Sequence, residues 1–244
     1  TLPQPGDTTA VLATLTPQPD ASATQSGLQQ ALSGPLSVKA LGPNARVAVF
    51  DTDTGNLLYD RSASNPAIPA STNKLLTSAA VLNAYGADYR IKTSVVQGSS
   101  PTDLILVGGG DPLLRTTNPG PDDTPAASLS DLADQTASAL KAAASGGGEM
   151  PTTLTATVNF NDSLFSGPKT APSWPSSYVA SNLVSPITAL MINGGGGADP
   201  AKTAATTFVS LLKKRGISVT AAPARVTAGS GGTEVAAVNS PALS

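Results

Sequence analysis

Residues 69–80 read PASTNKLLTSAA, and the rest of the chain is organised around them. Pro69 suits a position at or just before the first turn of a helix, and the Ala and Leu residues that follow are strong helix formers. The stretch therefore predicts a helix that begins near Ser71. Side chains three residues apart lie on one helix face, so we expect the Ser71 hydroxyl and the Lys74 amine to lie within hydrogen-bonding distance.

This pairing suggests nucleophilic catalysis. A serine hydroxyl is a weak nucleophile unless a base takes its proton, and a lysine can be that base if burial or a neighbouring cation lowers its pKa from about 10.4. The apolar run after Lys74 predicts such burial, and the helix N-terminus adds N–H donors for an oxyanion. Ser71 as nucleophile and Lys74 as base are the candidate catalytic residues. The alternative interpretation is an N-cap serine on a core helix.

The spacing Ser-x-x-Lys alone is not diagnostic, because it also occurs from Ser138, Ser166 and Ser210. Ser138 and Ser210 fall within Ala/Leu-rich helical patterns, and Ser166 is followed by the turn residues Gly and Pro. Ser71 differs from these three because it combines a preceding proline, a predicted helix start and an apolar continuation.

The composition of the 244 residues excludes several classes of protein. The chain contains no cysteine and no histidine, so Cys/His metal sites, disulfides and a histidine base are excluded. A hydrolytic serine would need a lysine, a carboxylate or water as its base. A net charge of −2, without a long Lys/Arg cluster, argues against a nucleic-acid partner. No apolar run reaches the ~18 residues of a membrane span.

The remaining pattern predicts an α/β chain in more than one part. Residues 1–26 are rich in Pro, Thr, Gln and Ser and indicate a flexible leader. Strands are expected at residues 46–51, 57–61, 90–96, 104–107, 154–160 and 217–226, and helices at 28–36, 129–144 and 203–215. Residues 53–56 and 108–112 are turn signals, with Asp111 holding the second, and residues 161–186 form a long irregular segment. The order from residue 90 onward indicates an α/β unit distinct from the one that holds Ser71.

Several segments, in one order, resemble a known family. They are residues 68–74 (IPASTNK), 106–112 (LVGGGDP), 161–165 (NDSLF), 171–175 (APSWP), 185–190 (SPITAL) and 238–243 (VNSPAL). The chain is similar over residues 40–244 to the low-molecular-mass class C penicillin-binding proteins, which are D-alanyl-D-alanine carboxypeptidases and endopeptidases.

The resemblance implies an α/β (α+β) fold with a penicillin-binding, serine β-lactamase-like domain and a large inserted α/β region. The implied organisation is a leader at 1–26, the N-terminal part of the catalytic domain at 27–90, an insertion at 91–236 and a return to the catalytic domain at 237–244. Ser71 matches the acyl-accepting nucleophile and Lys74 the lysine that takes its proton. No cofactor and no metal are implied.

The sequence departs from the family pattern in one respect. The only Ser-x-Asn triplet is residues 71–73, inside the first motif, and Lys-Thr-Gly does not occur. We therefore expect this chain to be the N-terminal portion of a longer protein, with the missing C-terminal half of the same protein as a partner. We expect the isolated chain to be essentially inactive.

The implied activity is hydrolysis of the terminal D-Ala-D-Ala bond of peptidoglycan stem peptides through an acyl-enzyme on Ser71, as a carboxypeptidase or also an endopeptidase. β-Lactam antibiotics are the implied inhibitors, and the implied location is extracytoplasmic, in the periplasm or cell-wall space. Two alternatives stay open: a β-lactamase or esterase on the same fold, and a catalytically silent cell-wall binding protein.

Overall fold

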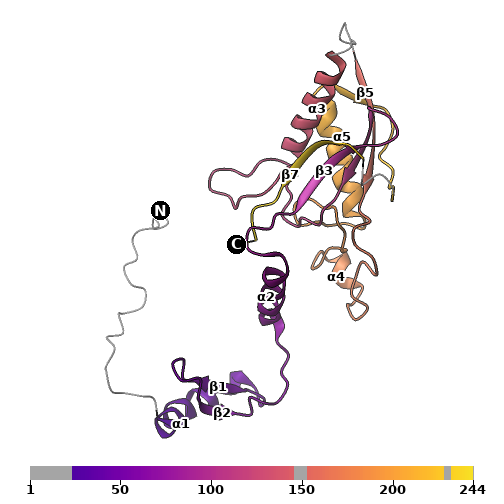
Figure 1. The fold of residues 1–244 in the computed structure, drawn as a ribbon. Helices are drawn as coiled ribbons and strands as arrows, with labels where there is room; N and C mark the ends of the chain where they lie inside the picture. Colours follow the sequence, from indigo (N-terminus) through magenta and orange to yellow (C-terminus); the bar gives the residue numbers. More distant parts are fainter. Residues whose placement is uncertain (1–23, 146–152, 228–231, 244) are drawn as a thin grey trace. The chain divides into compact units, whose positions relative to one another are not determined.

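The computed structural model describes residues 24–145, 153–227 and 232–243 (Figure 1). The expected leader at 1–26 lies outside these residues except for its last three, which already cap and begin a helix. The chain divides into two compact units, Thr1–Leu76 and Thr77–Ser244. Among the described helices, none combines the length and the hydropathy that crossing a membrane requires.

The first unit contains a helix and a β-hairpin. Helix α1 (Gln25–Ser33) begins at Thr24, whose Oγ1 accepts a hydrogen bond from the Gly27 N–H at 3.2 Å. Two 3-10 turns follow, η1 (Pro35–Ser37) and η2 (Lys39–Leu41), and then strands β1 (Val47–Phe50) and β2 (Leu57–Arg61). The strands pair antiparallel, and Asp51 Oδ1 accepts from the Asp53 and Thr54 N–H groups at 2.8 and 3.0 Å. The predicted hairpin is confirmed.

This first unit lacks a core of its own. Across residues 24–76 no residue is fully buried, and Phe50 and Leu57 of the hairpin are exposed. A hairpin of two strands is at best marginally stable in water unless further strands or a helix cover one face. The hydrophobic stabilisation of this unit from its own residues is therefore small.

The second unit is built on a five-stranded mixed sheet. The strand order is β6-β5-β4-β3-β7. The bounds are β3 (Lys92–Gln97), β4 (Asp103–Val107), β5 (Leu154–Asn161), β6 (Ile217–Val219) and β7 (Glu234–Asn239). Strand β3 runs antiparallel to both β4 and β7, whereas β4, β5 and β6 are mutually parallel. This arrangement is the α/β unit that the sequence predicts from residue 90 onward.

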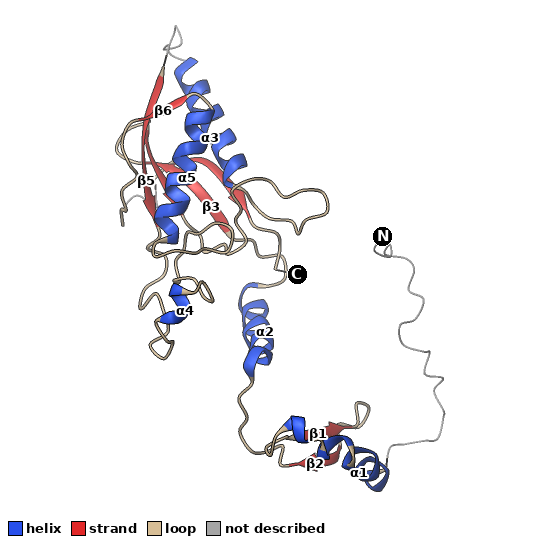
Figure 2. Cartoon of the chain, turned by 180° about the vertical axis from the view of Figure 1, so that it is seen from behind, coloured by secondary structure: helices blue, strands red, loops and turns tan. Residues whose placement is uncertain are grey.

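Helices α3 (Leu129–Ser145) and α5 (Pro200–Lys214) cover one face of this sheet, and Figure 2 shows them in front of the strands. The core lies between these layers and is formed by alternate strand residues and by the apolar stripes of both helices. Its largest fully buried side chains include Leu104, Leu106, Phe160, Leu132, Phe208 and Leu212. Arg215 links the two helices, since it donates to both Asp134 carboxylate oxygens at 2.7 and 2.6 Å.

Several element boundaries differ from the expected ones. Helix α5 begins at Pro200 rather than at residue 203, because Asp199 caps it by accepting from the Lys202 N–H at 3.1 Å. Strand β6 ends at Val219, and Arg225 contributes only an isolated bridge to Phe160. The long segment at 161–186 contains a single helical turn, α4 (Ser177–Ala180). Strand β7 was not expected.

The two chain segments that border the sheet of the second unit, before β3 and after β7, lie side by side. The Ile91 N–H donates to Ser240 Oγ and the Ser240 N–H donates to the Ile91 carbonyl, both at 2.9 Å. The Leu243 N–H donates to the Tyr89 carbonyl at 3.2 Å. Residues 237–239, which we expected to begin the return to the catalytic domain, form the end of β7. The division of the chain into a catalytic domain and an insertion stays a prediction.

Candidate active site

Ser71 lies where a short 3-10 turn, η3 (Ala70–Thr72), leads into helix α2 (Asn73–Tyr85). The turn is closed by hydrogen bonds to the Pro69 carbonyl, from the Thr72 N–H at 3.0 Å and from the Thr72 hydroxyl. The prediction of a helix that begins near Ser71 is confirmed. The preceding residue, Ala70, has a φ of +46°, in the left-handed region that costs a non-glycine residue about 1 kcal/mol or more.

The structure does not pair the two candidate catalytic residues. Ser71 and Lys74 are both exposed, and within the described residues neither side chain has a hydrogen-bond or ion-pair partner. The expected burial of Lys74 is wrong for these 244 residues. Leu75 and Leu76, which follow it, are themselves 71 % and 70 % exposed. The described residues therefore do not build the desolvated environment that a lysine base requires.

The other three Ser-x-x-Lys occurrences show no catalytic geometry. Ser138 and Ser210 are exposed in the middle of α3 and α5, and the Ser210 hydroxyl donates to the Thr206 carbonyl of its own helix at 3.1 Å. Lys169 is engaged elsewhere, since its Nζ lies 3.4 Å from Asp162 Oδ2. Among the four, only Ser71 stands at a helix start after a proline.

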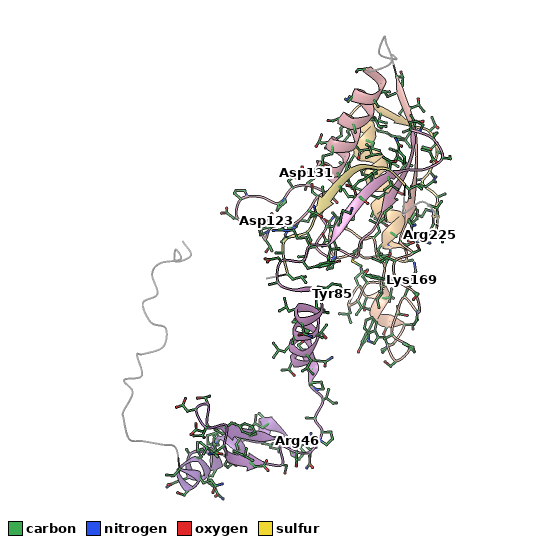
Figure 3. All side chains as sticks on the ribbon, viewed as in Figure 1. Arg46, Tyr85, Asp123, Asp131, Lys169 and Arg225 are labelled. Atoms are coloured by element: carbon green, nitrogen blue, oxygen red, sulfur yellow. The ribbon has the colours of Figure 1, made fainter. Side chains whose placement is uncertain are left out.

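The second unit contains a buried carboxylate with several partners. Asp162, whose side chain is 6 % exposed, accepts from Arg225 Nε at 2.9 Å and from the Thr188 hydroxyl at 3.0 Å, besides its contact with Lys169. Figure 3 labels the two basic partners, Lys169 and Arg225. Arg225 Nη2 also lies 2.7 Å from Asp199 Oδ1, at the start of α5. Burial raises the pKa of Asp162, but the Thr188 hydrogen bond and the charges of Arg225 and Lys169 outweigh it and lower the pKa below its ordinary value.

This network fastens the long segment that follows β5 to the N-terminus of α5. Both oxygens of the buried Asp162 carboxylate are paired with side chains, which indicates a structural role for this residue. The Arg225 guanidinium also lies 5.1 Å from the centre of the Phe160 ring. Sequence patterns could not reveal these contacts, because Arg225 and Asp162 are 63 residues apart.

Asp111 is the other buried carboxylate, at 3 % exposure. Its Oδ1 accepts from the Leu113 N–H at 2.9 Å, which confirms that Asp111 holds the turn at residues 108–112. Its Oδ2 has no hydrogen-bond partner among the described residues. Burial raises the pKa of Asp111, and the single hydrogen bond from Leu113 only partly offsets this effect.

Comparison with known proteins finds one matching family profile and several relatives named carboxypeptidases. The sequence profile described as the D-Ala-D-Ala carboxypeptidase 3 (S13) family matches residues 28–198. Carboxypeptidase Rv3627c of Mycobacterium tuberculosis is 35 % identical over 192 residues, which are 76 % of this chain and 39 % of that protein. Carboxypeptidase DacB of Mycolicibacterium smegmatis is 32 % identical over 234 residues, 90 % of this chain and 47 % of that protein. The chain thus spans less than half of the length of these relatives.

Among solved structures, penicillin binding protein 4 (dacB) from Haemophilus influenzae is similar to this chain with a TM-score of 0.59 and 15 % identity. The match covers 82 % of this chain and 57 % of that structure. At this level of identity the likeness concerns the fold, and it confirms the predicted fold class.

Proposed function

Because this chain belongs to the D-Ala-D-Ala carboxypeptidase 3 (S13) family, we propose that it carries the nucleophile of a serine D,D-carboxypeptidase that acts on peptidoglycan stem peptides. The observation that carries the proposal is the position of Ser71 in η3, directly before α2, with Lys74 three residues later in the first turn of α2. The left-handed φ of Ala70 supports it, because such strained residues cluster at functional sites.

The proposed reaction has two steps. Ser71 Oγ attacks the carbonyl carbon of the terminal D-Ala-D-Ala bond and transfers its proton to Lys74 Nζ, the peptide bond breaks, and the released D-alanine takes a proton from Lys74. Water then attacks the resulting ester, which returns the hydroxyl to Ser71 and frees the shortened peptide. A β-lactam would form the corresponding ester on Ser71, because its strained amide takes the place of the peptide bond. The same chemistry on a cross-link would be endopeptidase activity.

The two mycobacterial relatives contain more than half of their length beyond the part that matches this chain. We propose that polypeptide equivalent to this remaining part completes the site. Leu75 and Leu76 are exposed beside Lys74, and although α1 packs against β2, no residue of the first unit is fully buried among the described residues. Burying two leucines contributes about 1.5–3 kcal/mol each and would desolvate the adjacent amine. The same polypeptide would supply the Ser-x-Asn and Lys-Thr-Gly motifs.

The remaining proposals concern organisation and location. The pairing of residues 89–91 with 240–243 supports residues 91–236 as an insertion, because an inserted domain leaves and rejoins its host at neighbouring points. This large second unit favours a D,D-carboxypeptidase over a β-lactamase, which resembles the short form of the fold. The proposed substrate lies outside the cytoplasmic membrane, so we place the protein there.

The proposal is tested by covalent labelling with a fluorescent penicillin, in a polypeptide that contains this chain together with the two further motifs. Ser71→Ala should abolish the label, whereas Ser138→Ala, which alters another Ser-x-x-Lys, should leave it unchanged. Retention of the label in Ser71→Ala would contradict the assignment of the nucleophile. A polypeptide that binds cell-wall peptides but is never labelled would instead be a silent binding protein.

A further inference from the structure

The sheet of the second unit has a hollow on the face that α3 and α5 do not cover. Along β3, Val95 points into the core, so Lys92, Ser94 and Val96 lie on the opposite face. These three residues line a cavity of about 390 Å³. Its other walls come from the end of β4, the residues after β5, and the start of β7. A volume of this size admits a small molecule.

One hydroxyl in this cavity is unused. Ser94 is 7 % exposed and lines the cavity, yet among the described residues its Oγ has no hydrogen-bond partner. The neighbouring Asn161 differs, because its Oδ1 accepts from the Ser163 N–H and hydroxyl at 2.9 and 2.7 Å and its Nδ2 donates to the Thr227 carbonyl. Because Ser94 Oγ is not one of the buried, unsatisfied atoms, it is open to the cavity, and a hydroxyl that binds nothing in the protein is available to a ligand there.

Two opposite charges border the same cavity. Lys92 Nζ and Glu234 Oε2 lie 2.7 Å apart, with their side chains 55 % and 46 % exposed. An exposed ion pair contributes little net free energy, so a ligand that offers one carboxylate and one ammonium group can replace it at small cost. The apolar part of the lining is Val96, Val107 and Leu164, which suits a small apolar side chain.

We propose that this cavity binds amino acids and dipeptides that carry both a free amine and a free carboxylate and have small side chains. The ligand carboxylate pairs with Lys92, its ammonium group with Glu234, and the Ser94 hydroxyl hydrogen-bonds to the carboxylate or peptide group. D-alanine and D-alanyl-D-alanine have this chemistry. We further propose that the ligand is the released D-alanine or the D-alanyl-D-alanine terminus of the enzyme's own substrate. Only this second statement rests on the proposed function.

The test is a titration of the 244-residue chain carrying Ser71→Ala, followed by calorimetry and by NMR chemical-shift changes, with D-alanine and D-alanyl-D-alanine as probes. N-acetyl-D-alanine lacks the free amine and D-alaninamide lacks the carboxylate. Each should bind at least about tenfold more weakly than D-alanine, which corresponds to about 1.4 kcal/mol. Equal binding of the blocked and zwitterionic probes, or no saturable binding of either zwitterion, overturns the proposal.

Substitutions of residues that line the cavity test whether the probes bind there. Lys92→Met and Ser94→Ala should each weaken D-alanyl-D-alanine binding about tenfold or more, whereas Lys141→Met, at an exposed position of α3, should not change it. Circular dichroism reports whether each variant folds, and Glu234→Gln replaces Lys92→Met if that variant does not. Folded variants with unchanged affinity overturn the proposal. The titration uses a chain without the Ser71 hydroxyl and measures no acylation. A failure to bind the probes would therefore leave the penicillin-labelling test of the proposed function unaffected.

Discussion

Arg90 donates a hydrogen bond of 3.0 Å to the carbonyl oxygen of Ser240, a residue 150 positions further along the chain. Together with the bonds between Ile91 and Ser240, it ties the segment before β3 to the segment after β7. A unit joined at a single place can be carried by another domain without interrupting that domain's core. This pairing supports our proposal that residues 91–236 are an insertion.

Ser240→Ala should destabilise the second unit. Ser240 is buried, and its Oγ accepts from the Ile91 N–H at 2.9 Å while donating to the Pro241 carbonyl at 2.7 Å. Alanine leaves the Ile91 N–H without this acceptor, so we expect the free energy of unfolding to fall by about 1–3 kcal/mol in urea denaturation. Ser210→Ala, on the exposed side of α5, is the control and should change it by less than about 0.5 kcal/mol. Equal effects at the two positions would contradict a specific role for Ser240.

Gly109→Ala should be strongly destabilising because no Cβ fits at this position. A Cβ built there would collide with the Lys92 carbonyl oxygen, which belongs to strand β3 and cannot move without breaking the sheet. We expect the loss to exceed about 2 kcal/mol in urea denaturation. Gly120→Ala is the matched control, because its nearest neighbour, Asp123 Oδ2, would lie at an ordinary 3.6 Å. A Gly109→Ala variant as stable as Gly120→Ala would contradict this prediction, because it would show that the segment after β4 can move away from Lys92 at little cost.

Asp111 and Asp162 should respond to pH in opposite directions. Burial raises the pKa of Asp111, so its folded state favours the neutral carboxyl; the resulting stability is present below the unfolded pKa and is lost as pH rises through the raised value. Asp111→Asn removes this titration, so the variant should gain stability relative to the parent as the pH rises above the unfolded pKa of about 3.9. A stability difference independent of pH would contradict the buried, half-satisfied state of Asp111.

The pKa of Asp162 is shifted in the opposite direction to that of Asp111. Although burial raises its pKa, the Thr188 hydrogen bond and the charges of Arg225 and Lys169 bring the net value below normal. Its contribution is therefore present above the unfolded pKa and is lost as pH falls through the lowered folded value. Asp162→Asn should be less stable than the parent at neutral pH, and the gap should narrow in acid. Urea denaturation at several pH values measures both carboxylates.

Lys74→Arg should separate the charge of this side chain from its basicity. Arginine stays protonated and cannot take the Ser71 proton, so penicillin acylation of the completed protein should slow by about 10²–10⁴. Lys141→Arg, on the surface of α3, should leave the rate unchanged. Acylation of Lys74→Arg at the parental rate would exclude Lys74 as the base.

The isolated 244-residue chain, which lacks the other motifs, should also be labelled at least about 10²-fold more slowly than the completed protein.

The features predicted correctly depend on short stretches of sequence. The hairpin at residues 47–61 follows from alternation around a turn, and α3 from its apolar period. Strand β7 was missed because Val235 to Val238 is short and Ala-rich. Its conformation comes from pairing with β3, about 140 residues earlier, which no local pattern can show.

The sequence by itself determined that a serine would start a helix with a lysine one turn later, because helix start signals and the 3.6-residue period act within one turn of chain. It also determined the family, through motifs that keep their order. Only the tertiary structure decided what surrounds each side chain. Among the described residues, Lys74 and the two leucines after it are exposed, Asp162 is buried with three partners, and Ser94, whose hydroxyl has no partner, lines one cavity with Lys92 and Glu234. Burial and charge pairing join residues far apart in the chain, so they exist only once the sheet has formed.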